Sequence, residues 1–235
     1  MSEASDDPRV RAGATKRLRT RAALLAAATE LFETRGWPGT RMEDIATAAG
    51  VSSATAYNHF PTKHAIVGAA YEPVLRDVTL RVPHAGAGSG TAVELLSTVV
   101  HDAAVAARAR TNLTVAFTSA VQEAAALREG RPLDPEDPND PRSYVQLPAA
   151  VAQLVTEAQR TGELRAFPPG PEIGANMMNL LVLRVMNRRE ESPAATAEVI
   201  LTLLLGALKP ELLVAAGPDA RPFASPAGPP GTDAS

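Results

Sequence analysis

Apolar side chains recur along this chain at intervals of three and four residues, the period of an α-helix lying against a core. The first such pattern predicts a helix that begins near Thr15 or Lys16 and ends at Gly36. Its expected core face consists of Leu24, Ala27, Ala28, Leu31 and Phe32. Aromatic residues make up only 4% of the chain, whereas β-sheets favour aromatic and β-branched residues. We therefore expect an all-α fold.

Residues 40–60 (TRMEDIATAAGVSSATAYNHF) predict two short helices joined by a tight turn. Thr40 and Glu43 have the spacing of a capping box at the start of the first helix. Gly50 stands where a helix end needs a left-handed residue, and Ser52 is a natural N-cap for the second helix. Two helices around a glycine turn are typical of a helix-turn-helix, whose second helix enters the DNA major groove.

Further helices are predicted toward the C-terminus. Thr62 is expected to cap a helix that reaches residue 80, which Pro73 should either kink or split. The next helices are expected over residues 91–109, 111–127 and 144–161, with Gly162 at the last helix end. Residues 174–187 and 196–208 are apolar over most of their circumference, which indicates helices covered on more than one side. We expect these last two helices, within residues 174–208, to form a homodimer interface.

Two segments between the helices have an unusual composition. Residues 81–90 contain three glycines after an apolar run, which is compatible with a nucleotide-binding loop or with a flexible connection. Because the spacing is not that of a phosphate-binding loop and no Lys-Ser or Lys-Thr pair follows, we favour the connection. Residues 131–141 place a proline at every third position among acids. This pattern is compatible with an extended polyproline segment or a lid over a pocket, although we favour an acidic surface loop.

These patterns divide the chain into four parts. Residues 1–14 are polar and are expected to be a disordered arm. An N-terminal three-helix domain containing the helix-turn-helix should occupy residues 15–62, and a C-terminal helical bundle residues 63–212. Residues 213–235 are rich in proline, glycine and alanine and are expected to be a disordered tail.

Charge is distributed unevenly along the 235 residues. The net charge is −3, yet residues 9–41 hold eight basic side chains against two acidic ones. A basic end on an acidic chain is typical of a DNA-binding lobe. The chain has no cysteine, no secretory leader and no apolar run long enough to span a bilayer. We therefore expect a cytoplasmic protein that does not engage a membrane.

An enzyme, or a helical interaction module with a purely structural helix-turn-helix, would be the alternative class of protein. The four histidines are scattered, and neither an HExxH nor a GxSxG motif is present. His101 and Asp102 are adjacent in sequence and so point in different directions on a helix, which makes a poor catalytic dyad. We expect no catalytic site, no metal and no cofactor.

Residues 21–69 resemble the N-terminal DNA-binding domain of the TetR family of bacterial transcriptional regulators. The motifs that carry the resemblance are Glu30-Leu31-Phe32, Gly36-Trp37, Thr40, Glu43-Asp44-Ile45-Ala46, Ala48-Ala49-Gly50-Val51-Ser52, Thr55, Tyr57, His59-Phe60-Pro61 and Lys63. The resemblance implies a homodimer that binds double-stranded DNA at a pseudo-palindromic operator and a small-molecule effector through its C-terminal domain. A repressor released by the effector is the implied function, with an activator of the same fold as the alternative.

The resemblance also implies roles for individual residues. Ser53, Ala54 and Asn58 match positions that meet base edges, and an Asn amide can bond adenine bidentately. The positions that match phosphate contacts are Thr40, Thr55, Tyr57, His59 and Lys63. Ser52 belongs to the same DNA-binding set. Small residues at positions 53, 54 and 56 depart from the family pattern and leave the second helix almost without charge. Phosphate attraction should therefore come mainly from the first helix, Lys63 and the basic arm.

The effector site is indicated only by polar residues on otherwise apolar helices, since ligand pockets are mostly apolar with a few converging polar groups. The candidates are His101, Asn112, Thr118, Gln122, Tyr144, Asn176 and Asn179. We expect the effector to bind better to a second state of the dimer. In that state the helix after residue 62, levered near Pro73, moves the two DNA-binding domains apart.

Overall fold

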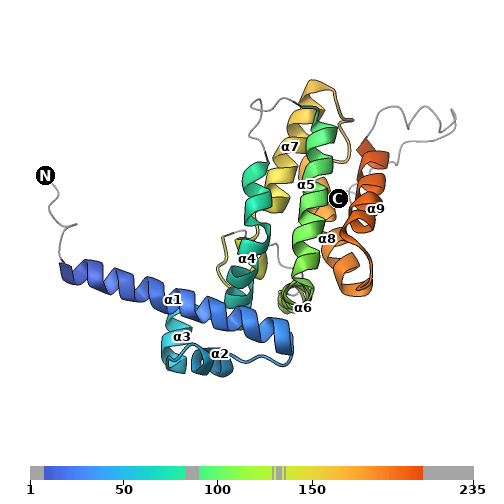
Figure 1. Cartoon of the computed structure of the whole chain (residues 1–235). Helices are drawn as coiled ribbons and strands as arrows, with labels where there is room; N and C mark the ends of the chain where they lie inside the picture. Colours follow the sequence, from blue (N-terminus) through green and yellow to red (C-terminus); the bar gives the residue numbers. More distant parts are fainter. Residues whose placement is uncertain (1–7, 83–89, 129, 131–133, 135, 209–235) are drawn as a thin grey trace, which may run out of the picture.

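The computed structural model describes residues 8–82, 90–128, 130, 134 and 136–208, and every regular element in these ranges is helical. The N-terminal helices are α1 (Pro8–Arg35), α2 (Met42–Ala48), α3 (Ser53–His59) and α4 (Lys63–Arg81). They are followed by α5 (Ala92–Ala109), α6 (Thr111–Leu127), the 3-10 helix η1 (Pro141–Tyr144), α7 (Leu147–Thr161), α8 (Gly170–Asn187) and α9 (Pro193–Leu208). Figure 1 shows α1 running beneath the bundle, with α2 and α3 on its outer side and α4 leading up into it. The all-α prediction is confirmed.

The first helix begins earlier than its hydrophobic pattern indicates. It starts at Pro8, so residues 8–14 are helical and the predicted disordered arm is wrong for them. Residues 11–19 are exposed and present no apolar stripe, which is why periodicity does not detect this part of the helix. Alanine, arginine and lysine there favour helix on their own, and proline is tolerated in a first turn. The basic residues therefore stand on a helix that projects from the bundle (Figure 1).

The cap of α2 differs from the predicted capping box. The N-cap is Arg41, whose backbone N–H donates to the Asp44 carboxylate at 3.2 Å. Thr40 and Glu43 have the spacing of a capping box, but α2 begins one residue later than this box requires, so Arg41 and Asp44 form the box instead. The other local signals are confirmed: Gly50 has a φ of +69°, and the Ser52 hydroxyl accepts the Thr55 N–H at 3.2 Å.

The long helix α4 joins the helix-turn-helix to the bundle. Thr62 caps it as predicted, accepting the Ala65 N–H at 3.0 Å. Pro73 does not split the helix, which runs unbroken to Arg81. In the bundle core, the Tyr71 ring stacks on Phe117 of α6 with centroids 4.3 Å apart. Burial raises the pKa of the Tyr71 hydroxyl well above its usual range.

The remaining helices follow the sequence pattern closely. The predicted spans of α5 and α6 are confirmed, and α7 ends at Gly162 with a φ of +80°. The last two helices begin three or four residues earlier than predicted, at Gly170 and Pro193. Gly174 lets α8 approach α7 closely, because a Cβ there would lie 2.2 Å from the Pro148 carbonyl oxygen.

The connections are only partly described. Most of the glycine-rich segment (residues 83–89), residues 1–7 and the expected tail lie outside the described residues. In the proline-rich segment, the Asp137 and Asp140 N–H groups donate to the carbonyls of Asp134 and Asp137 at 3.2 and 3.1 Å. These bonds form turns, so the polyproline alternative is wrong for residues 136–140. Asp140 is buried, which a simple surface loop does not explain. Within the described part of the chain, no helix is both long and apolar enough to cross a membrane.

Candidate DNA interface and effector cavity

The outer face of α3 presents small and polar side chains. Ala54 and Asn58 are exposed one helical turn apart, so they share one face of the helix. Ser53 and Thr55 flank that face and are partly exposed. The hydroxyls of Ser52 and Thr55 lie 2.9 Å apart at the helix start. Ala56 and Phe60 are buried on the opposite side, which fixes the outer face toward solvent. This face can offer an amide and hydroxyl groups to base edges and phosphates.

Tyr57 lies beside that face and binds α2. Its ring is 43% exposed, and its hydroxyl donates to the Glu43 carboxylate at 3.2 Å. Reduced contact with solvent and the nearby Glu43 charge raise the pKa of the Tyr57 hydroxyl. A phosphate contact through this hydroxyl would therefore have to replace a bond that already ties α2 to α3.

His59 stands at the end of α3 close to basic residues of α1. The guanidinium of Arg21 lies over the Phe60 ring at 4.2 Å and its Nη1 donates to the His59 carbonyl at 3.4 Å. Burial, together with the charges of Arg17 and Arg21, lowers the pKa of the His59 imidazole. Three groups that can carry positive charge, Arg17, Arg21 and His59, thus lie close together where α1 crosses α3. The hydrophobic periodicity of the sequence did not single out Arg17 or Arg21 as members of this site.

Two residues predicted to contact phosphate point inward instead. Thr40 is fully buried, and its hydroxyl contacts the carbonyls of Gly36 and Leu31 at 2.8 and 3.2 Å. The Lys63 ammonium donates to the carbonyls of Trp37 and Thr40 at 2.8 and 3.1 Å. It also lies 3.8 Å from the centre of the Trp37 ring. The turn between α1 and α2 leaves carbonyls that need donors. Both side chains fulfil that need, so a phosphate contact through either of them would have to replace these bonds.

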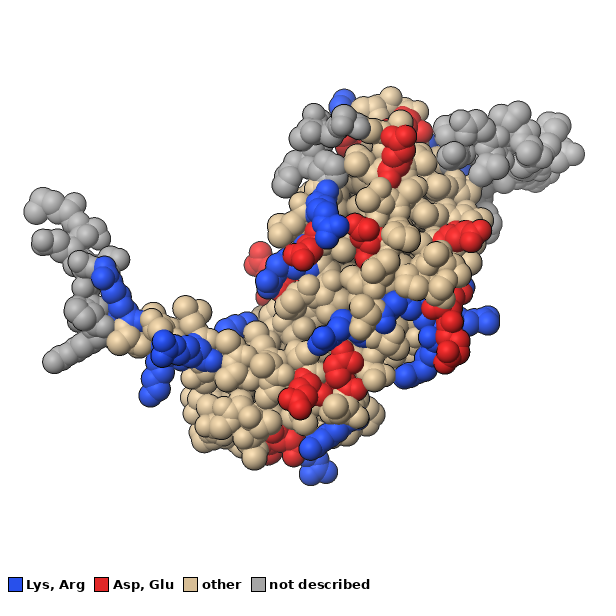
Figure 2. Space-filling view, viewed as in Figure 1, with Lys and Arg blue, Asp and Glu red and all other residues tan. Residues whose placement is uncertain are grey.

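Charge on this side of the molecule follows α1 rather than α3. Figure 2 shows basic side chains along the outer part of α1, while the surface at the lower end of the molecule, where α3 lies, is largely uncharged. Arg11, Lys16, Arg17 and Arg19 are all exposed. The arrangement matches an interface in which α1 attracts the phosphate backbone and α3 meets the bases.

A cavity of about 350 Å³ lies between α6, the segment after η1, α7 and α8. Its apolar lining comes from Phe117, Val121, Val145, Pro148, Ala149, Ala175, Met178 and Val182. Its polar lining comes from Thr118, Arg142, Ser143, Gln146 and Asn179. A mostly apolar space with a few polar groups is the usual composition of a small-molecule site.

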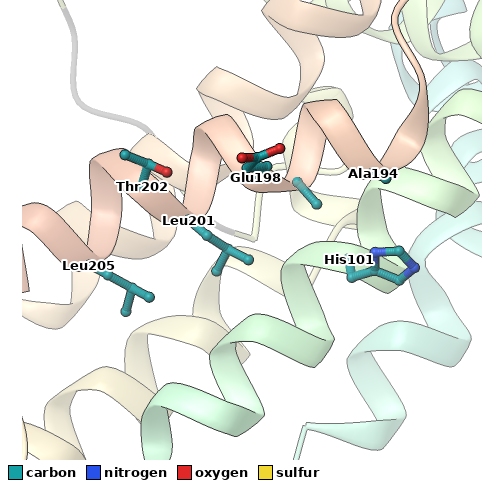
Figure 3. A pocket seen from close by; sticks show the side chains of 7 residues that line it. His101, Ala194, Glu198, Leu201, Thr202 and Leu205 are labelled. Atoms are coloured by element: carbon teal, nitrogen blue, oxygen red, sulfur yellow. The ribbon is translucent and has the colours of Figure 1, made fainter.

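The cavity contains two of the seven predicted effector residues, Thr118 and Asn179. Tyr144 lines a smaller neighbouring hollow of about 140 Å³. His101 lines a separate open groove between α5 and α9, which shares no lining residue with the cavity (Figure 3). Asn112 instead donates to the Glu33 carbonyl at 3.0 Å. Asn112, Gln122 and Asn176 line none of these three hollows, so the structure does not support them as effector residues.

The polar groups that sequence reasoning missed come from the end of the proline-rich segment. Arg142 binds Asp140 through two bonds of 2.8 and 2.5 Å, and Arg128, the residue directly after α6, lies 3.6 Å from the same carboxylate. Burial alone would raise the pKa of Asp140, but the Arg142 bonds outweigh it and hold that pKa below its usual range. Of these three charged groups only Arg142 lines the cavity, so its guanidinium places a positive group on this wall.

A helix-turn-helix with a basic helix beside it, joined to a helical domain, is the architecture of a DNA-binding transcription regulator. Residues 24–70 match the family model of the bacterial regulatory proteins of the tetR family. The chain is 26% identical over 188 residues to the transcriptional regulator EthR of Mycolicibacterium smegmatis, covering 77% of this chain and 81% of EthR. It is 35% identical over 74 residues to CymR of Pseudomonas putida, covering 32% of this chain and only 36% of CymR.

The fold is shared with solved structures as well. FadR of Thermus thermophilus, a TetR-family transcriptional repressor solved in complex with lauroyl-CoA, superposes with a TM-score of 0.60 at 22% identity. The match covers 88% of this chain and all of FadR. Residues 24–70 therefore carry the DNA-binding domain of the TetR family of bacterial regulators, and the chain as a whole shares the helical fold of FadR.

Proposed function

We propose that this protein is a dimeric repressor that leaves its operator when a small, mostly apolar molecule enters the cavity beside α6. This proposal rests on the observation that one chain combines two separate surfaces, each suited to a different partner. The exposed face of α3 suits base edges, while the cavity between α6, α7 and α8 suits a ligand. As a DNA-binding regulator the protein would act in the cytoplasm, where bacterial DNA is found.

On DNA, Asn58 and its neighbours on α3 would select the sequence. The Asn58 amide can bond an adenine edge through two atoms, and Ala54 can contact a thymine methyl group. Ser53 and Thr55 offer hydroxyls to bases or phosphates. The exposed basic residues of α1, with His59 when protonated, would supply the phosphate attraction that α3 lacks. Binding should therefore depend strongly on salt while specificity rests on few side chains.

A homodimer would present two copies of α3 to a pseudo-palindromic operator. The apolar surface of the last two helices supports this arrangement, because Leu203 of α9 is 53% exposed and Leu183 of α8 is 41% exposed. The groove in Figure 3 adds Leu201 and Leu205, which lie at the other edge of the solvent-facing side of α9 from Leu203. Exposed leucines on neighbouring helices indicate a surface that a second subunit covers. Two-fold symmetry would then set the spacing of the half-sites at about one turn of DNA.

The effector would be an amphiphile with a long apolar part and one polar end. Phe117, Val121, Met178 and Val182 suit the apolar part, and Arg142, Gln146 and Asn179 suit the polar end. The positive wall at Arg142 favours a polar end that carries negative charge or strong acceptors. Lauroyl-CoA, the molecule in complex with the Thermus FadR, is an amphiphile of this kind, with an apolar lauroyl chain and a polar, negatively charged end. We therefore choose lauric acid and lauroyl-CoA as the first probes.

The proposal is tested by selecting bound sites from random duplex DNA with the full-length chain. We expect the recovered sequences to share two half-sites related by a two-fold axis, and binding to weaken steeply as salt rises. A helical interaction module would recover no common sequence and would not bind random duplex at low salt. Binding of the probes, followed by thermal shift, then tests the effector site separately.

A further inference from the structure

A direct bond joins α6, the helix that contributes Phe117, Thr118 and Val121 to the cavity lining, to the DNA-binding domain. The indole N–H of Trp37, in the turn between α1 and α2, donates to Oε2 of Glu123 on α6 at 2.8 Å. The other oxygen of Glu123 lies 3.5 Å from Nε2 of His64, in the first turn of α4. One carboxylate on α6 thus contacts both the turn that precedes α2 and the start of the helix that carries the DNA-binding domain.

Glu123 is also close to the cavity along its own helix. Phe117, Thr118 and Val121 of α6 line the cavity, and Glu123 follows Val121 by two residues. Successive residues of a helix move together, because their backbone hydrogen bonds keep the helix rigid. A ligand that shifts or rotates this part of α6 would therefore move the Glu123 carboxylate relative to Trp37.

The partners of Glu123 are fixed more firmly than Glu123 itself. Trp37 is only 5% exposed, packs against Phe32 and lies under the Lys63 ammonium. The Glu123 side chain is 51% exposed, so water can replace its bonds when α6 moves. The start of α6 is held separately, through Arg110 and Asn112 against Glu33 of α1. Because Trp37 is fixed and Glu123 is accessible to water, the hydrogen bond between them can break and form again when α6 moves.

We propose that Glu123 is a positioning residue that transmits occupancy of the cavity to the DNA-binding domain through Trp37 and His64. The inference rests on the proposed function, because it needs both DNA binding and a ligand site beside α6. Movement of Glu123 changes how the turn between α1 and α2 and the start of α4 are held. The orientation of α3 changes with them. A contact that only stabilised the fold would not alter the response of DNA affinity to the cavity.

The first test uses Trp37 as a reporter, since it is the only tryptophan in the chain. Glu123→Ala removes the acceptor of the indole bond and should shift the emission spectrum of Trp37 in the folded full-length protein. Glu123→Gln keeps an acceptor and should retain most of the native spectrum. The control is Gln122→Ala, a change at the exposed neighbouring position of α6, which should leave the spectrum unchanged. Identical spectra for Glu123→Ala and the native protein would mean that the bond does not exist in solution and would overturn the proposal.

The second test measures transmission without needing the natural effector. Ala175→Phe places a ring into the cavity from α8, and Ala149→Phe does so from α7, so one variant can replace the other if it fails to fold. Affinity for the duplex selected from random DNA is measured for each in the native and Glu123→Ala backgrounds. We expect filling the cavity to change DNA affinity about fivefold or more in the native background, a typical size for coupling between sites. In the Glu123→Ala background the change should fall below about twofold, and Glu123→Gln should restore part of it.

The possible results separate the two proposals. If the native protein binds no DNA, the proposed function fails. If filling the cavity leaves the affinity of the native background unchanged, the effector site is misassigned and the transmission role falls with it. If filling the cavity changes affinity equally in the native and Glu123→Ala backgrounds, the regulator and its effector site stand and only the role of Glu123 is overturned.

Discussion

Lys63 binds the turn between α1 and α2 through its ammonium group, so its removal should affect folding more than DNA binding. Lys63→Ala loses two bonds to carbonyls and the contact with the Trp37 ring. We expect a loss of about 1–2 kcal/mol in the free energy of unfolding, measured by thermal or denaturant unfolding. The dependence of DNA affinity on salt should keep the native slope, because no phosphate contact is lost.

The matched control for Lys63 is Lys16→Ala, at an exposed position on α1. This variant should unfold like the native protein, while the slope of log affinity against log salt falls by about one. A reduced slope for Lys63→Ala with native stability would mean that its ammonium reaches DNA after all.

We expect His59 to make DNA affinity depend on pH. In the free protein, burial and the charges of Arg17 and Arg21 hold the pKa of His59 below its ordinary value of 6.5. A phosphate beside the imidazole would raise that pKa in the complex, so binding takes up a proton. Affinity should therefore increase as pH falls through the pKa of the complex and reach its full gain below the pKa of the free protein. Titration of native protein and His59→Ala at fixed salt measures this, and equal pH profiles for the two would exclude a phosphate contact at His59.

Sequence alone predicts those residues whose role is local. Ser52, Thr62, Gly50 and Gly162 act within their own helix ends, so the order of residues suffices to assign them. Thr40 differs, because its hydroxyl suits a carbonyl as well as it suits a phosphate. Only the path of the turn after α1 places two carbonyls within reach of that hydroxyl.

At the scale of elements, α4 meets η1 through a glycine. A Cβ at Gly68 would lie 2.6 Å from the Tyr144 ring and 2.8 Å from the Pro141 carbonyl oxygen. Gly68→Ala should therefore force η1 away from α4 and lower the free energy of unfolding by about 1–3 kcal/mol. Gly13→Ala, in open space on α1, is the control and should cause no loss. Native stability for Gly68→Ala, measured by denaturant unfolding, would show that α4 and η1 are less tightly packed than described.

The helices were easier to predict than the cavity. Each buried helix face leaves its own periodic signal, and α5 and α6 follow theirs closely. The cavity is formed by residues from α6, η1 and its following segment, α7 and α8, which are distant in sequence. Polar residues on apolar helices therefore located Thr118 and Asn179 but also pointed to Asn112, which binds Glu33 instead. Arg142 and Ser143 lie in the short helix η1, directly after the proline-rich segment, where no hydrophobic periodicity singled them out.

At the scale of the whole molecule, the proposed dimer would connect the DNA-binding face of α3 and the cavity into one regulator. Leu203→Glu would place a charge on the exposed apolar face of α9 and should weaken dimerisation at least about tenfold. Sedimentation equilibrium measures this directly, and DNA affinity should fall with it. Leu80→Glu introduces the same charge at an exposed leucine of α4 and serves as the control. Equal dimerisation by Leu203→Glu and the native protein would place the subunit interface elsewhere.

The central claim is that the exposed face of α3 selects a DNA sequence, and Asn58 tests it most directly. Affinities of the native protein and Asn58→Ala are measured by fluorescence anisotropy on the selected duplex and on a scrambled duplex of the same composition. The account predicts that Asn58→Ala loses about 1–3 kcal/mol of binding to the selected duplex while affinity for the scrambled duplex and the salt slope stay native. An equal loss on both duplexes, or no loss on either, would contradict the claim that α3 reads DNA through Asn58.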